Sequence, residues 1–309
     1  MTVSQTRPTS PVELAAARAP GARSLDAVIL QPIEEPVTVR TIQSWVVKGQ
    51  KFACLTCYDA LTARWLERAG IPLLLVGDSA AEVILGQPST IHAPLDFLIT
   101  INAAVKRGAP KCLVMADMPF MSYQTSEADC LRNAGRFMTE GLADAVKLEV
   151  DRTFLGLIAK LAHAGVPAVA HLGLKPQHVK REGGYRAAGR TASQAKDIIS
   201  TAVAMEEAGA TMILLEAMPA EVSAAIVAKV KIPVIGCGAG PACHGQIVVL
   251  QDLLGMTDRQ PAFALPMAAI GRQIAETAAE WGDRVRRGEL GEHPYHMSPG
   301  EANALKVNP

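Results

Sequence analysis

Residues 73–79 read LLLVGDS, and residues 113–120 read LVMADMPF. In each stretch an aliphatic run suited to complete burial stops at an aspartate, Asp78 or Asp117. A carboxylate is costly to bury without a partner, so its position directly after a buried run needs a physical reason. The two stretches belong to a longer series, and that series predicts the fold.

Eight short apolar runs follow one another from residue 52 onward, at 52–57, 73–77, 112–116, 145–149, 167–172, 212–216, 233–237 and 247–250. Stretches with helical periodicity separate most of them, at 59–69, 96–107, 126–140, 151–164, 193–208 and 219–230. Continuous apolar runs are typical of parallel strands that are covered on both faces. The pattern therefore predicts a (β/α)8 TIM barrel, and a doubly wound open sheet is the alternative.

The composition favours a small-molecule ligand. The 309 residues contain 30 basic and 30 acidic side chains, so charge gives no reason to expect a nucleic acid or an anionic membrane as partner. No apolar run approaches the about 20 residues that a membrane-spanning helix needs. We expect a cytoplasmic protein whose six cysteines are reduced.

The chain is expected to form a single large domain with an extension. Residues 1–37 combine Pro, Ala and Arg without sustained periodicity, which predicts a flexible N-terminal extension. An organellar targeting peptide is a less favoured alternative, because Glu13 lies among the arginines. Residues 38–309 are expected to form the barrel and a C-terminal helical tail.

Polar side chains stand at the ends of consecutive predicted strands. In a TIM barrel the carboxyl ends of all strands meet at one rim, where side chains project into the active site. The glycine-rich GCGAG at 236–240 follows the seventh strand and indicates a tight turn or an anion-binding loop. The rim residues predicted in this way are Asp78, Asp117, Lys147, Glu149, His171 and Glu216.

Three of these residues predict a metal site. Asp78 and Asp117 on adjacent strands, with Glu149 nearby, form an oxygen-rich set that favours Mg²⁺ with several waters retained. Two structural alternatives are open: Asp78 caps the following helix, and Asp117 pairs with an Arg or Lys. For Lys147, an ion pair with Glu149 on the same strand is compatible with a role in the site.

The ordered motifs resemble one known family over about residues 40–297. They include TCYDALTARWLERAGIPLLLVGDS, AVKRGAPKCLVMADMPFMSY, VKLE, HLGLKPQ, GGYRAAGRT, LLEAMP and IPVIGCGAGPACHGQ. On these motifs the chain resembles the ketopantoate hydroxymethyltransferases. The resemblance implies a (β/α)8 barrel, assembled as a homo-oligomer (a decamer), that uses Mg²⁺ and 5,10-methylenetetrahydrofolate. The implied reaction is hydroxymethyl transfer to 3-methyl-2-oxobutanoate through a Mg²⁺-stabilised enolate, giving 2-dehydropantoate for pantothenate and coenzyme A.

The resemblance also implies a role for each rim residue. Asp78 and Asp117 match metal-binding aspartates that also face the substrate, and Glu149 matches the carboxylate beside the metal. Ser79 and Lys147 match the groups that hold the 2-oxo acid. His171 and Glu216 match catalytic site residues, with Glu216 as the general base.

Departures from the family pattern leave the substrate open. Residues 77–82 read GDSAAE where the family commonly reads GDSLGM, and Gln87-Pro88 replaces His-Asp. Glu82 thus adds a charge near the site. Two alternatives are a related Mg²⁺-dependent 2-oxo acid lyase or mutase with another substrate, and a barrel homologue without activity. The Lys-Lys-Cys-Gly-His loop of the phosphoenolpyruvate mutase type is not found in this sequence.

Overall fold

The computed structural model describes residues 32–258 and 260–301. Most of the extension expected at 1–37 therefore lies outside the described residues. The chain divides into two compact units, one ending at Leu250 and the other beginning at Gln251.

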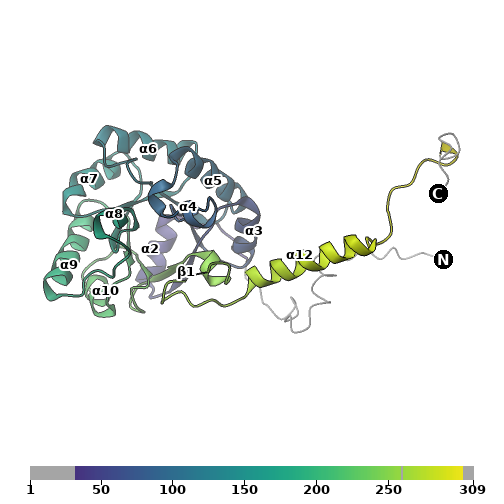
Figure 1. Cartoon of the computed structure of the whole chain (residues 1–309). Helices are drawn as coiled ribbons and strands as arrows, with labels where there is room; N and C mark the ends of the chain where they lie inside the picture. Colours follow the sequence, from purple (N-terminus) through teal and green to yellow (C-terminus); the bar gives the residue numbers. More distant parts are fainter. Residues whose placement is uncertain (1–31, 259, 302–309) are drawn as a thin grey trace. The chain divides into compact units, whose positions relative to one another are not determined.

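The first unit contains a closed barrel of eight parallel strands in sequential order (Figure 1). This arrangement confirms the predicted (β/α)8 barrel and excludes the open sheet. Each apolar run predicted from the sequence contains or overlaps one strand. The strands are β1 (Phe52–Thr56), β2 (Leu73–Val76), β3 (Leu113–Asp117), β4 (Ala145–Glu149), β5 (Ala168–Gly173), β6 (Met212–Glu216), β7 (Val234–Cys237) and β8 (Gly245–Val248).

Helices lie between successive strands as far as β7 and surround the barrel (Figure 1). Polar caps define where several of them begin, since the side chains of Asp59, Ser126 and Thr191 each accept a hydrogen bond from the backbone N–H three residues on. The longer helices are α3 (Ala60–Arg68), α5 (Leu95–Gly108), α6 (Glu127–Thr139), α7 (Leu155–His163), α9 (Ala192–Glu207) and α10 (Ala220–Val227). Short helices follow β2 and β5, at α4 (Ala80–Val83) and α8 (Val179–Glu182).

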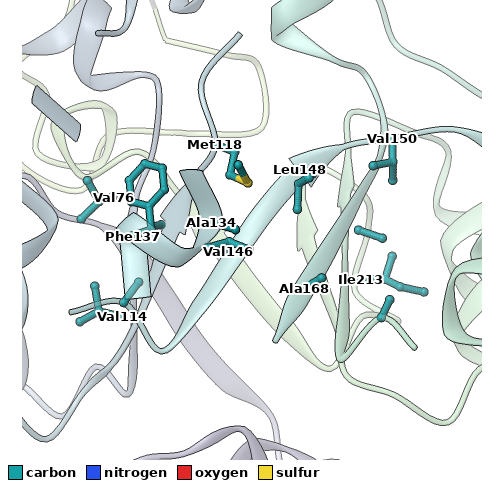
Figure 2. Packing of buried hydrophobic residues seen from close by; sticks show 14 of the residues in the cluster. Val76, Val114, Met118, Ala134, Phe137, Val146, Leu148, Val150, Ala168 and Ile213 are labelled. Carbon is teal, nitrogen blue, oxygen red and sulfur yellow. The ribbon is translucent and has the colours of Figure 1, made fainter. Parts of the chain in front are cut away.

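Side chains alternate between two apolar layers along each strand. In β3, Val114 belongs to the layer packed under the helices, whereas Leu113 and Met115 belong to the barrel interior. Figure 2 shows part of the outer layer, with Val114 and Phe137 of α6 among the labelled side chains. The same alternation fixes which residues at the strand ends point into the barrel, because successive side chains of a strand face opposite sides.

An additional helix, α2 (Val39–Val47), packs against the interior layer. Its buried Ile42 belongs to the same cluster as Phe52 and Leu73 at the start of their strands, so α2 covers the amino end of the barrel. Val37, assigned to the extension from the sequence, is also buried there, and its N–H donates to the carbonyl of Lys111 at 2.8 Å. The barrel is therefore apolar and covered at one end, which leaves the carboxyl end for a site.

The connection from β7 to β8 contains no helix, because only residues 238–244 join the two strands. Gly238 and Gly240 have φ of 64° and 85°, in the region that favours glycine. The GCGAG segment at 236–240 therefore forms a tight turn after β7. Lys51 Nζ donates to the carbonyls of Ala242 and Cys243 at 3.0 and 2.6 Å. These contacts hold the returning chain beside β1.

The second unit contains the 18-residue helix α12 (Ile270–Arg287). None of the described helices is both long enough and apolar enough to cross a membrane. The six cysteines form no disulfide with one another.

The packing predicts a sharp contrast between two leucines of the first unit. Leu161 of α7 is completely buried, whereas Leu61 of α3 is 63% exposed. We expect Leu161→Ala to lower the free energy of unfolding by about 2–5 kcal/mol, because it removes buried apolar contacts and leaves a cavity. Leu61→Ala should cost less than about 0.5 kcal/mol. Urea denaturation of both variants checks this, and equal losses would contradict the assigned core.

Candidate active site

Five of the six predicted rim residues continue the interior-facing side of their strands, whereas Asp78 lies beyond the end of β2. Asp117 stands two residues beyond the interior Met115, and Lys147 two residues beyond the interior Ala145. His171 bears the same relation to Val169, and Glu216 to Leu214. Strand register then places neighbours side by side, since Asp117 pairs with Lys147 and Glu149 pairs with His171. The barrel thus gathers these side chains above its apolar interior.

A buried ion pair lies at the centre of this group. Lys147 Nζ is 2.8 Å from Asp117 Oδ1, with side chains 5% and 1% exposed. The other carboxylate oxygen of Asp117 accepts the backbone N–H of Asp78 at 3.1 Å. The alternative that Asp117 pairs with a lysine is confirmed. The alternative ion pair between Lys147 and Glu149 is not formed, because the strand register places Asp117 directly opposite Lys147.

His171 connects Lys147 to Glu216. Its Nδ1 is 3.3 Å from Lys147 Nζ, and its Nε2 is 3.3 Å from Glu216 Oε2. Because an ammonium group can only donate, the first contact assigns Nδ1 as acceptor and places the ring proton on Nε2, toward Glu216. Burial, together with the charge of Lys147, lowers the pKa of His171. The imidazole is therefore neutral, and its Nε2 lies 3.3 Å from the Glu216 carboxylate without making a directed hydrogen bond.

Glu216 lies at the carboxyl end of β6, and its side chain is 20% exposed. It does not cap the following helix, because α10 begins after Pro219 without a side-chain cap. The next residue, Ala217, has φ of 45°, a conformation that is uncommon and costly for a residue other than glycine. On the neighbouring strand, a Cβ at Gly173 would meet the carbonyl oxygen of Glu216 at 2.3 Å, so the close approach there requires glycine.

Glu149 is held by groups that the sequence analysis did not identify. Both of its carboxylate oxygens accept the backbone N–H of Gln177, at 3.2 and 3.1 Å. Its own N–H donates to the hydroxyl of Tyr123 at 3.1 Å. The closest nitrogen of His171 is 4.0 Å away, too far for a hydrogen bond.

Two further contacts involve the segment after β2. Ser79 Oγ is 2.7 Å from the hydroxyl of the buried Tyr58. Asp78 does not cap α4, since Ser79 occupies the N-cap position and makes no side-chain cap bond. Glu82 Oε1 accepts a hydrogen bond from the hydroxyl of Tyr185 at 3.3 Å, so the additional charge of this chain is linked to the loop before α9.

The charge of the site is unbalanced in a way that suits a cation. Asp78, Asp117 and Glu149 are buried around one ammonium group, that of Lys147. Burial and the charge of Asp117 raise the pKa of Asp78 well above its usual value, and burial raises the pKa of Glu149 to about 8. A divalent cation would stabilise the ionised acids.

The donor set fits Mg²⁺ with two protein carboxylates. Asp117 Oδ1 accepts no directed hydrogen bond, although Lys147 lies beside it. Asp78 and Asp117 supply hard oxygen ligands, and Mg²⁺ usually keeps several waters. Within the described residues no group of three or more His, Cys, Asp or Glu side chains is arranged to hold a metal. Glu149 therefore fits a position beside such a site better than one in direct contact with the ion.

Three residues of the site were missed from the sequence, namely Tyr58, Tyr123 and Gln177. Gln177 stands in η4 (Pro176–His178), beyond the end of β5, and strand-end reasoning does not reach it. The proline-glutamine pair within HLGLKPQ was the available signal.

A model of the ketopantoate hydroxymethyltransferase family matches residues 36–293. The 3-methyl-2-oxobutanoate hydroxymethyltransferase of Hyperthermus butylicus is 43% identical over 274 residues, which cover 88% of this chain and 95% of that protein. The enzyme of the same name from Thermobifida fusca is 42% identical over 252 residues, covering 82% and 90%.

Solved structures with a similar fold include phosphonopyruvate hydrolase in complex with oxalate and Mg²⁺. It has a TM-score of 0.56 and 14% identity, covering 87% of this chain and 94% of that one. For 2,3-dimethylmalate lyase, a member of the PEP mutase/isocitrate lyase superfamily, the TM-score is 0.54 at 17% identity, covering 87% and 97%. At these identities the likeness concerns the fold alone.

The buried ion pair predicts a pH-dependent loss of stability in Lys147→Met. The variant leaves the buried acids without an ammonium group, which should lower the free energy of unfolding by about 3–5 kcal/mol at pH 8. Glu149 already has a folded-state pKa of about 8 against an ordinary 4.5, so the folded chain binds protons that the unfolded chain releases between these values. Lowering the pH to 5.5 should therefore reduce the loss.

Urea denaturation in EDTA at both pH values measures this effect. Arg132→Met is the control, because the Arg132–Asp129 pair is exposed and the loss of this pair should change the free energy of unfolding little. If Lys147→Met loses as much unfolding free energy at pH 5.5 as at pH 8, or more, the result would contradict the inferred excess of acidic groups around Lys147.

Proposed function

The chain belongs to the ketopantoate hydroxymethyltransferase family, and from that premise we propose the reaction that it catalyses. It transfers a hydroxymethyl group from 5,10-methylenetetrahydrofolate to 3-methyl-2-oxobutanoate, giving 2-dehydropantoate, in pantothenate and coenzyme A biosynthesis. The observation that supports this most strongly is the buried group of carboxylates around Lys147, which continues to His171 and Glu216 on consecutive strands.

Asp78 and Asp117 would hold Mg²⁺. Bound there, the ion would act as a Lewis acid on the oxygens of the 2-oxo acid. The two aspartates are already adjacent, because Asp117 accepts the N–H of Asp78. Glu149 contributes negative charge from beside the site, where the backbone N–H of Gln177 holds it.

Lys147 and Ser79 would hold the 2-oxo acid. The ammonium group of Lys147 lies at the interior rim, where it can neutralise a substrate carboxylate. Ser79 follows Asp78 directly and is oriented by Tyr58. Ser79 and Lys147 thus each lie next to one of the two aspartates, where both could contact a bound 2-oxo acid.

Glu216 would remove the proton from C3 of the substrate. Its carboxylate is partly exposed at the rim, and Nε2 of the neutral His171 lies 3.3 Å from it. When Glu216 takes the C3 proton, the electron pair left at C3 would form the new C–C bond to the one-carbon unit. Both C–N bonds that hold this unit on the folate break, and water supplies the hydroxyl oxygen. Tetrahydrofolate leaves with one proton from water and the equivalent of the C3 proton on its two nitrogens. Before proton transfer His171 accepts a hydrogen bond from Lys147 and lies beside the Glu216 carboxylate, so its role would be to orient the base.

The proposal also covers the preferred substrate, the oligomeric state and the cellular location of the protein. The preferred acid differs from 3-methyl-2-oxobutanoate if the Glu82–Tyr185 contact narrows the site, and a panel of 2-oxo acids that differ at C3 would reveal it. The family resemblance supports a homo-oligomer, a decamer, that acts on small molecules in the cytoplasm.

The metal role predicts that Asp78→Asn and Asp117→Asn lose all Mg²⁺-dependent activity, because each removes one anionic ligand while keeping the side-chain size. Deuterium exchange at C3 of 3-methyl-2-oxobutanoate, followed by NMR over a Mg²⁺ titration, measures it. Asp59→Asn is the control, since asparagine caps a helix as well as aspartate does. A wild-type Mg²⁺ response in Asp117→Asn would exclude this metal site.

The base role predicts a selective defect in Glu216→Gln. Glutamine keeps the size of the side chain but cannot accept the proton, so C3 exchange should fall about 10²-fold or more. The melting temperature and the binding of Mg²⁺ and 2-oxo acid should remain near wild-type values. The control is Glu221→Gln, an exposed glutamate in the first turn of α10, which should exchange normally. If Glu216→Gln exchanges C3 at the wild-type rate and only melts earlier, another group is the base.

A further inference from the structure

We propose that Gln177 is a positioning residue of this site, because its side-chain amide orients Asp78 while its backbone N–H orients Glu149. The inference rests on the proposed function, since it explains how the acids of that site are held. Gln177 lies within η4, and only 2% of its surface is exposed. It touches two acids that are 99 and 28 positions away in the sequence.

The nitrogen end of the amide is fully used. Gln177 Nε2 donates to Asp78 Oδ2 and to the carbonyl of Met118, both at 3.0 Å. An amide nitrogen carries two protons, so each contact takes one of them. Because the Met118 carbonyl belongs to the backbone directly after β3, this contact anchors the amide to a fixed point of the barrel.

The oxygen end of the amide fixes its orientation. Gln177 Oε1 lies 3.1 Å from both the hydroxyl of Tyr123 and Nε2 of Gln124, two groups that can donate. Turning the amide over would place its oxygen against the Asp78 carboxylate and the Met118 carbonyl, which are both acceptors. The network therefore admits one orientation, with the donor toward Asp78.

Gln177 orients Asp78 without neutralising it. Asp117 has Lys147 at 2.8 Å, but among residues 32–258 and 260–301 no cationic side chain lies within 4.0 Å of the Asp78 carboxylate. A neutral donor satisfies one lone pair of a carboxylate and leaves its charge for a cation, whereas a lysine or arginine would compete with that cation. Partners of this kind around metal ligands typically contribute about 10–100-fold to metal affinity or activity.

The test compares Gln177→Met with Gln124→Met. Methionine keeps the length of the side chain and the backbone N–H to Glu149 but removes the donor to Asp78. In calorimetric titration of the substrate-free chain with Mg²⁺, Gln177→Met should raise the Kd about 10–100-fold. Gln124→Met should leave the Kd unchanged, because Gln177 Nε2 still donates to Asp78 and to the Met118 carbonyl, and these two contacts keep the amide in place. Thermal unfolding of each variant shows whether it is folded.

A folded Gln177→Met with the wild-type Kd and only a lower melting temperature overturns the inference, since that pattern describes a purely structural residue. If Gln177→Met does not fold, Gln177→Asn takes its place, because the shorter side chain withdraws the amide from Asp78 and keeps the backbone N–H to Glu149. An unchanged Kd then counts against the inference and a raised Kd supports it. A wild-type chain that binds no Mg²⁺ contradicts the proposed function instead. In that case crystals of metal-free Gln177→Met decide, because an Asp78 carboxylate that keeps its orientation overturns the inference and one that rotates supports it.

Discussion

The buried ion pair between Lys147 and Asp117 sets the constraint that the rest of the site satisfies. Removing two charges from water is expensive, and the attraction between them offsets the cost only when the surrounding groups complete their hydrogen bonds. Two more acids, Asp78 and Glu149, are buried beside the pair, so one ammonium group faces three carboxyl groups. Gln177, which donates to both of these acids, adds no positive charge, and the nearby His171 is neutral. The arrangement therefore gathers more acidic groups than one ammonium group can balance, and a divalent cation would stabilise their ionised forms.

The alternation of side chains in the barrel makes this arrangement possible. Interior residues such as Met115 and Leu214 form an apolar layer, and the next interior positions on the same strands are Asp117 and Glu216. At the opposite end, α2 covers the amino ends of the strands with the buried Ile42. Stability and chemistry are thus separated along the barrel axis, with apolar packing at one end and charged groups at the other. This separation is typical of the fold.

The sequence predicts the strands and most of the rim, because a buried parallel strand is a continuous apolar run and its last polar residue is visible as the point where the run stops. It does not predict the partner of Lys147. The sequence suggests Glu149, which lies two residues further along the same strand, whereas the register with β3 places Asp117 opposite Lys147. This register depends on how two strands pair and cannot be predicted from the sequence of one strand. Gln177, which lies in a short helical turn after β5, is missed for a related reason. Its contact with Asp78 joins segments 99 positions apart and exists only once the barrel is closed.

The central claim is that the charged end of this barrel catalyses Mg²⁺-dependent hydroxymethyl transfer. The most direct measurement incubates the full chain with 3-methyl-2-oxobutanoate and 5,10-methylenetetrahydrofolate, in Mg²⁺ or in EDTA, and follows 2-dehydropantoate by mass spectrometry. The account predicts product that accumulates with Mg²⁺ and stops with EDTA. No product in Mg²⁺, or equal product in EDTA, would contradict it.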